Sequence, residues 1–371
     1  MLLTFMLPGL IVILNWLLPL ALPFGVKVAI GLGVMIVSYY YFWSRLSSGS
    51  VFAPEFPRLI VVLFNWLLAA VLFLALFQLV LDVGVLCVDL VRWRLVSLPD
   101  TVREGAALFA LLLSAVGVMN AVKVPAVKDV RVTIAGLPPQ FEGYRLLQLT
   151  DLHISRLFPA SWAKAVVARA NTAGADLIVV TGDFIDGSVA MRQADIAPLE
   201  ALHAPDGVLA VAGNHEYFFD YNDWMQSLSQ LGITMLLNAH TVLTRGEGKL
   251  VVAGVTDLSA SAHGQAGPDI TAALQNSPAG APVILLDHQP RMAATAADHG
   301  VALQLSGHTH GGMIVGLDRL VARGNNGFVS GRYHVGGMTL YVSNGTGLWP
   351  GFALRLGCPP EMTRFTLTVE T

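Results

Sequence analysis

The stretch "LSGHTHGGM", from Leu305 to Met313, places two histidines one residue apart in a frame of glycines. The apolar run just before them, Val301 to Ser306, predicts a strand, so the histidines follow a strand end. Glycines allow the chain to turn there and leave no side chain to fill the space. On extended backbone His308 and His310 would alternate in direction, and their imidazoles would serve two different positions.

Four more apolar runs predict strands, and each is followed by Asp, Asn or His, either directly or after one glycine. These are Tyr144 to Thr150 before Asp151 and His153, Leu177 to Thr181 before Asp183, Val208 to Ala212 before Asn214 and His215, and Val283 to Leu286 before Asp287 and His288. Leu250 to Val255 and Thr339 to Ser343 predict further strands, while Ser161 to Ala173 and Arg291 to His299 suit helices. This alternation indicates an α/β fold, in which the carboxyl ends of the strands bring the polar residues to one rim.

The chemistry of this rim is that of a metal site. Imidazole, carboxylate and carboxamide ligands without thiolate suit Mn, Fe or Zn. Seven candidate ligands are too many for one ion but fit a pair of ions, ~3.5 to 4 Å apart, that share a carboxylate. The candidates are Asp151, His153, Asp183, Asn214, His288, His308 and His310. Each motif alone also has a structural explanation, such as a helix cap or a turn; five in series favour the site.

The first 122 residues have a different character. Of the whole chain 54% is hydrophobic, with a mean hydropathy of +0.62, and four long N-terminal stretches lack Asp, Glu, Lys and Arg. We expect four membrane helices, roughly at residues 3–22, 25–43, 59–81 and 104–122, although the first two could form one broken hairpin. At ~1.5 Å per residue, the third would reach roughly 35 Å, enough for a hydrocarbon core ~30 Å thick.

Two of these stretches share a similar octapeptide. "IVILNWLL" (Ile11 to Leu18) returns as "VVLFNWLL" (Val61 to Leu68). Two copies of a helical hairpin would explain the similarity, and so would chance among Leu-rich segments. Asn15 and Asn65 are costly to leave unpaired in lipid, so we expect them to form hydrogen bonds between helices.

The chemistry is concentrated after residue 122. All ten histidines lie there, with 16 of the 22 basic and 20 of the 25 acidic residues, a balance that does not suggest nucleic acid. Cys87 and Cys358 form no disulfide framework and no metal spacing. We expect a four-helix transmembrane domain at residues 1–122, a linker with a first strand at 123–143, and a catalytic domain at 144–371.

The ordered series D-x-H, G-D, G-N-H-E, a lone His after a strand and G-H-T-H-G resembles the calcineurin-like metallophosphoesterases. The resemblance extends from about Val130 to the C-terminus. The segments "VRVTIAGLPPQFEGYRLLQLTDLH" and "YVSNGTGLWPGFALRLGCPPEMTRFTL" are similar to a membrane-associated bacterial branch with YkuE-like and YaeI-like phosphohydrolases. Met313 stands where that branch usually has Gln, which bears on substrate contacts there and not on the metal ligands.

The resemblance implies a sandwich of two mixed β-sheets flanked by helices, here preceded by an all-α four-helix transmembrane domain. It implies that one ion takes Asp151, His153 and His310, that the other takes Asn214, His288 and His308, and that Asp183 bridges them. His215 would donate a proton and contact phosphate. Asn344 and Arg355, in the family-like tail, are weaker candidates for substrate binding.

The sequence thus predicts a membrane-bound phosphoesterase with two divalent ions, Mn, Fe or Zn. It would hydrolyse a phosphate ester or pyrophosphate bond through attack by a metal-bridging hydroxide. Because one helix would suffice as a tether, four helices suggest a lipid-linked substrate, such as a phospholipid. One alternative is a UDP-2,3-diacylglucosamine-type pyrophosphate hydrolase; another is a non-catalytic metal-binding membrane sensor or scaffold. A transporter is disfavoured, since the apolar spans lack intramembrane charges.

We expect an integral protein of the bacterial inner membrane, and the basic residues favour a cytoplasmic catalytic domain. With four spans, five basic residues would lie inside and four outside. The five are Arg45, Arg58, Lys123, Lys128 and Arg131, and the four are Lys27, Arg92, Arg94 and Arg103. The lipid bilayer is therefore the expected partner, while the sequence carries no sign of the oligomeric state.

Overall fold

A computed structural model describes residues 2–370 and divides the chain into two compact units. The helical unit comprises the residues up to Asn120 together with Pro350–Leu354. The sheet unit comprises Ala121–Trp349 and the residues from Arg355 onward. The C-terminal part of the chain therefore contributes a short segment to the helical unit.

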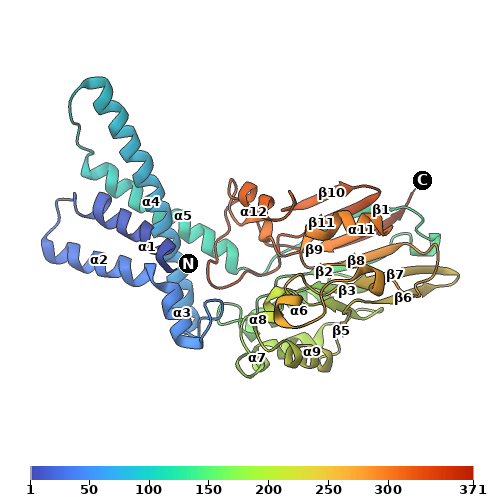
Figure 1. Ribbon diagram of the computed structural model, residues 1–371. Coiled ribbons are helices and arrows are strands. Elements are labelled where there is room, and N and C mark those ends of the chain that lie inside the picture. Colours follow the sequence, from blue (N-terminus) through green and yellow to red (C-terminus); the bar gives the residue numbers. More distant parts are fainter. Residues whose placement is uncertain (1, 371) are drawn as a thin grey trace. The chain divides into compact units, whose positions relative to one another are not determined.

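The helical unit contains helices of very different length (Figure 1). They are α1 (Leu2–Ile11), the π-helix η1 (Val12–Leu17), α2 (Phe24–Ser38), α3 (Tyr40–Ser48), α4 (Arg58–Arg92) and α5 (Asp100–Val122). Among the described residues, α4 and α5 are long and apolar enough to cross a membrane. A third span is formed if α2 and α3, which bend by 54° at their junction, are taken as one.

The expectation of four full-length spans is thus not met within residues 2–370. The first predicted helix is observed as α1 followed directly by the π-helix η1, and it ends at Leu17, before the predicted end at residue 22. Pro19 follows two residues later, and a helix usually ends before a proline. The second predicted helix breaks at Tyr39.

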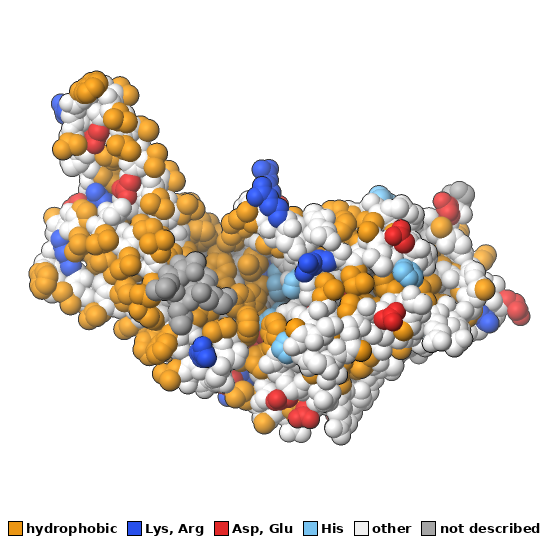
Figure 2. Space-filling model, viewed as in Figure 1, with side chains coloured by type: hydrophobic (Ala, Val, Ile, Leu, Met, Phe, Trp, Pro, Cys, Tyr) orange, Lys and Arg blue, Asp and Glu red, His pale blue; other side chains and the backbone are white. Residues whose placement is uncertain are grey.

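Large apolar side chains cover the outside of the helical unit, as Figure 2 shows on one face. Exposed examples on α4 and α5 are Leu59, Val80, Val91, Leu108 and Met119. A surface of this kind is unfavourable in water and favourable in hydrocarbon. Together with the two long helices, it supports association of the chain with a membrane.

The sheet unit consists of two six-stranded mixed sheets (Figure 1). The first has the order β1-β12-β2-β3-β4-β5 and the second the order β10-β11-β9-β8-β7-β6. The strands of the first are β1 (Val127–Ile134), β2 (Arg145–Leu149), β3 (Leu177–Thr181), β4 (Val208–Val211), β5 (Thr234–Met235) and β12 (Met362–Val369). Those of the second are β6 (Ala239–Arg245), β7 (Gly248–Gly254), β8 (Val283–Leu286), β9 (Leu303–Ser306), β10 (Gly331–Val335) and β11 (Met338–Val342).

The main core lies between the two sheets. It combines residues of the first sheet, such as Leu146 and Val179, with residues of the second, such as Val252 and Ile284, all essentially inaccessible to solvent. A second cluster places α10 (Ile270–Ala273) and α11 (Ala293–Asp298) with residues of the second sheet. The predicted sandwich of two mixed sheets flanked by helices is confirmed.

The seven predicted strands correspond to β2, β3, β4, β7, β8, β9 and β11. Strands β2, β3 and β4 run parallel to one another, as do β7, β8 and β9. Their carboxyl ends consequently lie at one edge of each sheet, which is why the polar residues after them converge.

Strand β12 was not predicted. It pairs parallel to β1 through Val127 and Met362, and antiparallel to β2 through Arg145 and Thr366. Strand β12 therefore lies inside the first sheet, between β1 and β2. Such pairing joins residues more than 200 positions apart, so no local pattern in the sequence announces it.

Candidate metal centre

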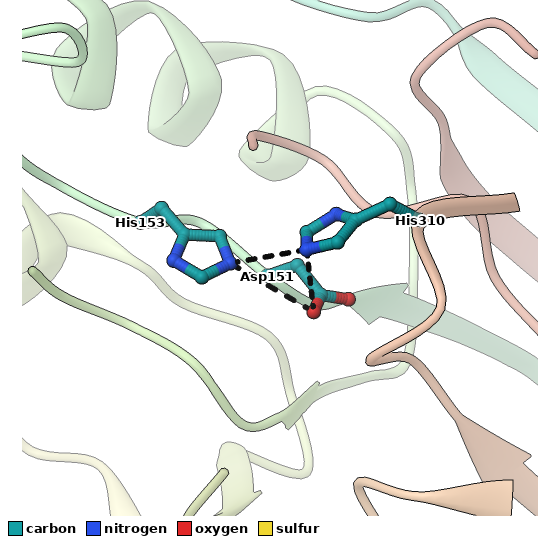
Figure 3. Close-up of side chains that lie close together, drawn as sticks. All are labelled: Asp151, His153 and His310. Carbon is teal, nitrogen blue, oxygen red and sulfur yellow. Dashed lines mark hydrogen bonds and ion pairs between the residues drawn. The ribbon is translucent and has the colours of Figure 1, made fainter. Parts of the chain in front are cut away.

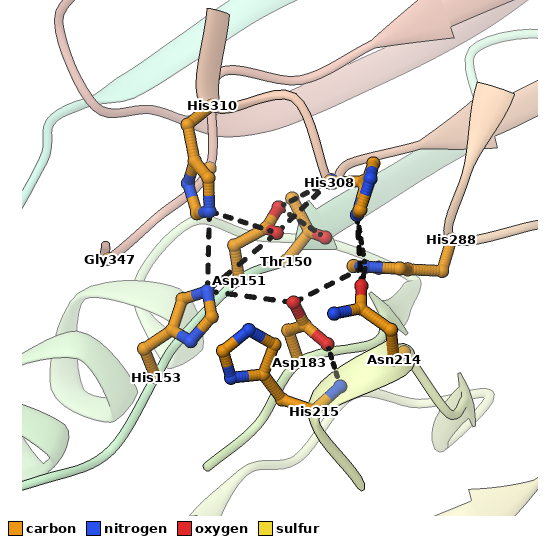
Figure 4. Close-up of polar contacts among 12 residues, drawn as sticks. Thr150, Asp151, His153, Asp183, Asn214, His215, His288, His308, His310 and Gly347 are labelled. Carbon is orange, nitrogen blue, oxygen red and sulfur yellow. Dashed lines mark hydrogen bonds and ion pairs between the residues drawn. The ribbon is translucent and has the colours of Figure 1, made fainter. Parts of the chain in front are cut away.

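The seven candidate metal ligands lie together at the carboxyl ends of the strands (Figure 4). One group consists of Asp151, His153 and His310, shown in Figure 3. The Nε2 atoms of His153 and His310 are 3.3 Å apart, and Asp151 Oδ1 is 4.0 Å and 3.7 Å from them. All three side chains are buried.

A second group contains Asn214, His288 and His308. Asn214 Oδ1 is 3.0 Å from His288 Nε2 and 2.9 Å from His308 Nδ1. The two imidazole nitrogens are themselves 3.3 Å apart. Burial and the nearby His288 lower the pKa of His308 to about 3, so its imidazole is neutral and free to act as a ligand.

Asp183 joins the two groups. Its Oδ2 is 3.6 Å from His153 Nε2 and 3.3 Å from His288 Nε2, while its Oδ1 accepts a hydrogen bond from the backbone of His215 at 2.9 Å. Burial acts to raise the pKa of Asp183, but His288 and His215 hold that pKa well below its usual value. The carboxylate is therefore ionised and lies between the groups.

The hydrogen-bond partners show that this donor set fits metal ions. His288 Nδ1 lies 2.8 Å from the Thr181 carbonyl, which only accepts, so Nδ1 carries the proton and Nε2 is bare in the neutral ring. That bare nitrogen faces the oxygens of Asn214 and Asp183. Lone pairs facing one another repel unless a positive charge lies between them, and a divalent ion supplies it.

A proton is the alternative positive charge. Burial acts to lower the pKa of His288, but Asp183 and Asp151 raise that pKa well above its usual value. Without metal, His288 thus holds a proton that a metal ion has to displace.

Five of the seven candidates have left-handed backbone, which is uncommon outside glycine. Their φ angles are 52° at Asp151, 45° at His153, 55° at Asp183, 68° at His308 and 50° at His310. The expectation of extended backbone at His308 and His310 is therefore wrong, because tight turns rather than strand alternation aim these imidazoles. Each such residue costs about 1–3 kcal/mol, a strain typical of functional sites.

Two glycines are required by close backbone approach. A Cβ on Gly307 would lie 2.2 Å from Thr150 Oγ1 and 2.4 Å from Asp151 Oδ2. A Cβ on Gly182 would lie 2.5 Å from the backbone nitrogen of Gly213. Gly307 thus lets the loop after β9 approach the loop after β2, and Gly182 lets the loop after β3 approach the loop after β4, without a side chain between them.

Sequence reasoning missed Asp186, which is fully buried. Its Oδ2 is 3.1 Å from His153 Nδ1, and its Oδ1 makes a short hydrogen bond with His215 Nδ1. Burial acts to raise its pKa, but His153 and His215 lower that pKa below the usual value. The only local signal was its place in "GDFID", three residues after Asp183.

His215 is cationic at neutral pH in this setting. Burial acts to lower its pKa, but Asp183 and Asp186 outweigh burial and raise the pKa to about 9. Its ring packs edge-on against His153, with ring centroids 4.6 Å apart. The predicted proton donor thus carries a proton beside the candidate ligands.

Glu216 ties two ligand loops together. Its carboxylate accepts from the backbone N–H groups of Asp183, Phe184 and Gly213 at 3.0, 2.8 and 2.7 Å. Burial and the charge of Asp183 raise its pKa to about 8. These bonds fix the start of the short helix α8 (Asn214–Phe218) against the loop after β3.

Asn344 and Arg355 are buried and bonded mainly to backbone. The Arg355 guanidinium donates to the carbonyls of His310 at 3.1 Å, Asn344 at 2.6 Å and Gly347 at 2.8 Å. Asn344 donates to the Pro359 carbonyl and accepts from the hydroxyl of Ser330. Both residues hold the C-terminal tail near the centre, and substrate binding by them stays a prediction.

Comparison with known proteins places this geometry in a family. Residues 144–312, which contain all five motifs, match the calcineurin-like phosphoesterases. The chain is 33% identical over 242 residues to the metallophosphoesterase YkuE of Bacillus subtilis, covering 62% of this chain and 81% of that one. The chain belongs to the calcineurin-like metallophosphoesterases. A Helicobacter pylori metallophosphoesterase is 30% identical over 282 residues, covering 76% of this chain and 74% of its own.

A vertebrate relative of this metallophosphoesterase also combines the two kinds of segment. A "Transmembrane protein with metallophosphoesterase domain" from Danio rerio is 32% identical over 290 residues, which cover 73% of this chain. The chain spans 65% of that relative's length and 61% of the length of its Bos taurus counterpart.

Asp183→Asn should abolish the effect of metal on stability, because the shared carboxylate loses its charge. At a free Mn²⁺ concentration of about 100 times the Kd, the wild type should gain about 2.7 kcal/mol against unfolding. Thermal unfolding of the full chain in detergent, with and without Mn²⁺, measures the gain. Asp298→Asn, at the exposed end of α11, is the control. An equal gain in Asp183→Asn would contradict the assignment.

Proposed function

We propose that this metallophosphoesterase hydrolyses a phosphate ester or pyrophosphate bond of a lipid-linked substrate, using two divalent ions, Mn, Fe or Zn. The observation that supports it is the pair of donor groups that share Asp183 Oδ2, 3.6 Å from His153 Nε2 and 3.3 Å from His288 Nε2. One ion would bind Asp151, His153 and His310, the other Asn214, His288 and His308, with Asp183 between them.

The residues around these ligands supply the remaining chemistry. When bound, a pair of divalent ions provides an activated water and charge neutralisation for the phosphate. Asp186 accepts from His215 Nδ1 and thereby keeps the other nitrogen, Nε2, available to deliver a proton to the departing oxygen. The same carboxylate orients His153 through its Nδ1, a role that outer carboxylates often have for ligand imidazoles.

His215→Ala should lower kcat by about 10² to 10⁴ for alkyl phosphates, whose leaving groups need a proton. The loss should be much smaller for an aryl phosphate with a good leaving group, and the metal content should be unchanged. Steady-state kinetics on both substrates and metal analysis measure these effects. His334→Ala, on the exposed side of β10, is the control. Equal losses on both substrates would argue against a proton donor.

The membrane character of the chain supports a lipid-linked substrate. Helices α4 and α5 provide far more apolar length than a tether needs. A substrate held by its acyl chains gains about 0.8 kcal/mol for each methylene that is buried.

Turnover should therefore depend on chain length at constant head group. Full-length enzyme in proteoliposomes should show a kcat/KM at least about tenfold higher for a long-chain phospholipid than for a short-chain, water-soluble analogue, which corresponds to about two buried methylenes. A series of acyl lengths provides the measurement. Equal or better turnover of the soluble analogue would count against a lipid-linked substrate.

We propose that the protein lies in the bacterial inner membrane with its catalytic domain in the cytoplasm, because the side on which α4 begins and α5 ends carries Arg45, Arg58, Lys123, Lys128 and Arg131, against Arg92, Arg94 and Arg103 at the connection between them. A C-terminal reporter that is active only in the cytoplasm should be active, and one that is active only outside should be silent. The reverse pattern would invert this orientation.

A further inference from the structure

Residues Pro350–Leu354, here called the tail loop, belong to the helical unit although the chain on both sides belongs to the sheet unit. Just before the loop, Thr346 and Gly347 donate backbone hydrogen bonds to Thr150 and Asp151, both at 2.8 Å. Directly after it comes Arg355, whose guanidinium binds the carbonyl of His310. The residues on both sides of the tail loop thus bind backbone carbonyls of candidate ligands, while the loop itself belongs to the helical unit.

One side chain of α4 holds both ends of the tail loop. Asn65 Nδ2 donates to the Pro350 carbonyl at 2.8 Å, and Asn65 Oδ1 accepts from the backbone N–H of Ala353 at 2.5 Å. The hydroxyl of Tyr40 donates to the same Pro350 carbonyl at 2.9 Å. Asn65 is 1% exposed and Ala353 is equally buried, so these bonds are shielded from solvent.

The carboxamide of Asn65 is well matched to this task. It offers a donor and an acceptor on one rigid plane, as a backbone amide does, and both are used. An amide left without hydrogen bonds among apolar helices costs free energy. The bonds between Asn65 and the tail loop therefore stabilise this arrangement of the loop. We expected Asn65 to bond another helix, and its Nδ2 does lie 3.4 Å from the hydroxyl of Tyr40 on α3; in addition it binds the backbone of the tail loop.

Asn15, in the similar octapeptide, has a different partner. Its Nδ2 donates to Asp82 Oδ2 at 2.7 Å, a bond between η1 and α4 that fits the expectation for this residue. The two octapeptides are therefore alike in sequence but not in role. Asn15 provides a matched control for any change at Asn65.

We propose that Asn65 is a positioning residue of the metal centre, acting through the tail loop. The bonds to Pro350 and Ala353 order the tail loop that directly precedes Arg355. Arg355 in turn holds the carbonyls of His310 and Gly347, and Gly347 holds the backbone of Asp151. His310 and Asp151 are candidate ligands of the same ion, so release of the loop should loosen that half of the site. This inference rests on the proposed function.

The test uses the full chain in detergent with Mn²⁺ as the probe. Asn65→Leu keeps the side chain's size and suits an apolar helix, but it removes both bonds to the loop. Hydrogen–deuterium exchange at Ala353 should become faster, and the Kd for Mn²⁺ should rise about tenfold, within the range known for outer partners of metal ligands. Asn15→Leu should change neither quantity.

Tyr40→Phe removes a single bond to Pro350 and should shift both quantities in the same direction by less. This variant keeps the inference falsifiable if Asn65→Leu does not fold. Unchanged exchange at Ala353 in the variants would show that Asn65 does not hold the loop. Faster exchange with an unchanged Kd would show that the loop does not position the ligands.

The failure of the proposed function has a different signature. A wild-type chain that binds no Mn²⁺ would overturn the proposed function and, with it, the positioning role. Exchange at Ala353 would still report whether Asn65 holds the tail loop.

Discussion

The structure depends on one electrostatic constraint: the Nε2 atoms of two imidazoles face a carboxylate oxygen of Asp183 at 3.3 and 3.6 Å. Such an arrangement is stable only with a positive charge among the donors. The surrounding fold keeps them in place. Parallel strands bring the loops to one edge, left-handed residues aim the side chains, and Glu216 ties two loops together through three backbone amides. Strain and burial that would be costly elsewhere are tolerated here because binding energy offsets them.

The sequence was sufficient to predict the main strands and the proximity of the candidate metal ligands. Buried parallel strands are continuous apolar runs, and their ends share an edge, so order along the chain translates into proximity. Asp186 was not predicted because it does not follow a strand directly. It reaches His153 and His215 only because the chain turns after Asp183. The left-handed backbone of His308 and His310 escaped too, since histidine indicates that conformation much more weakly than glycine does.

In the N-terminal part, the sequence was a poorer guide to structure. Apolar length revealed the membrane character but not where the helices end or bend, because the π-helix and the bend at Tyr39 fall within stretches of uniform hydropathy. Composition also gave no partner for Asn65. A hydrogen bond from a helix to a loop almost 290 residues later has no local pattern, and it lies within the helical unit, although nothing in the sequence indicates that residues 350–354 belong there.

The insertion of β12 between β1 and β2 has a consequence for biosynthesis. While the ribosome is still translating residues 362–369, the first sheet has a gap one strand wide. The nascent chain must then carry two open strand edges, which are prone to pairing with other chains. Helices α4 and α5 are made long before this point and can already be inserted in the bilayer. The first sheet is therefore completed only after the other eleven strands that the structure describes have been synthesised.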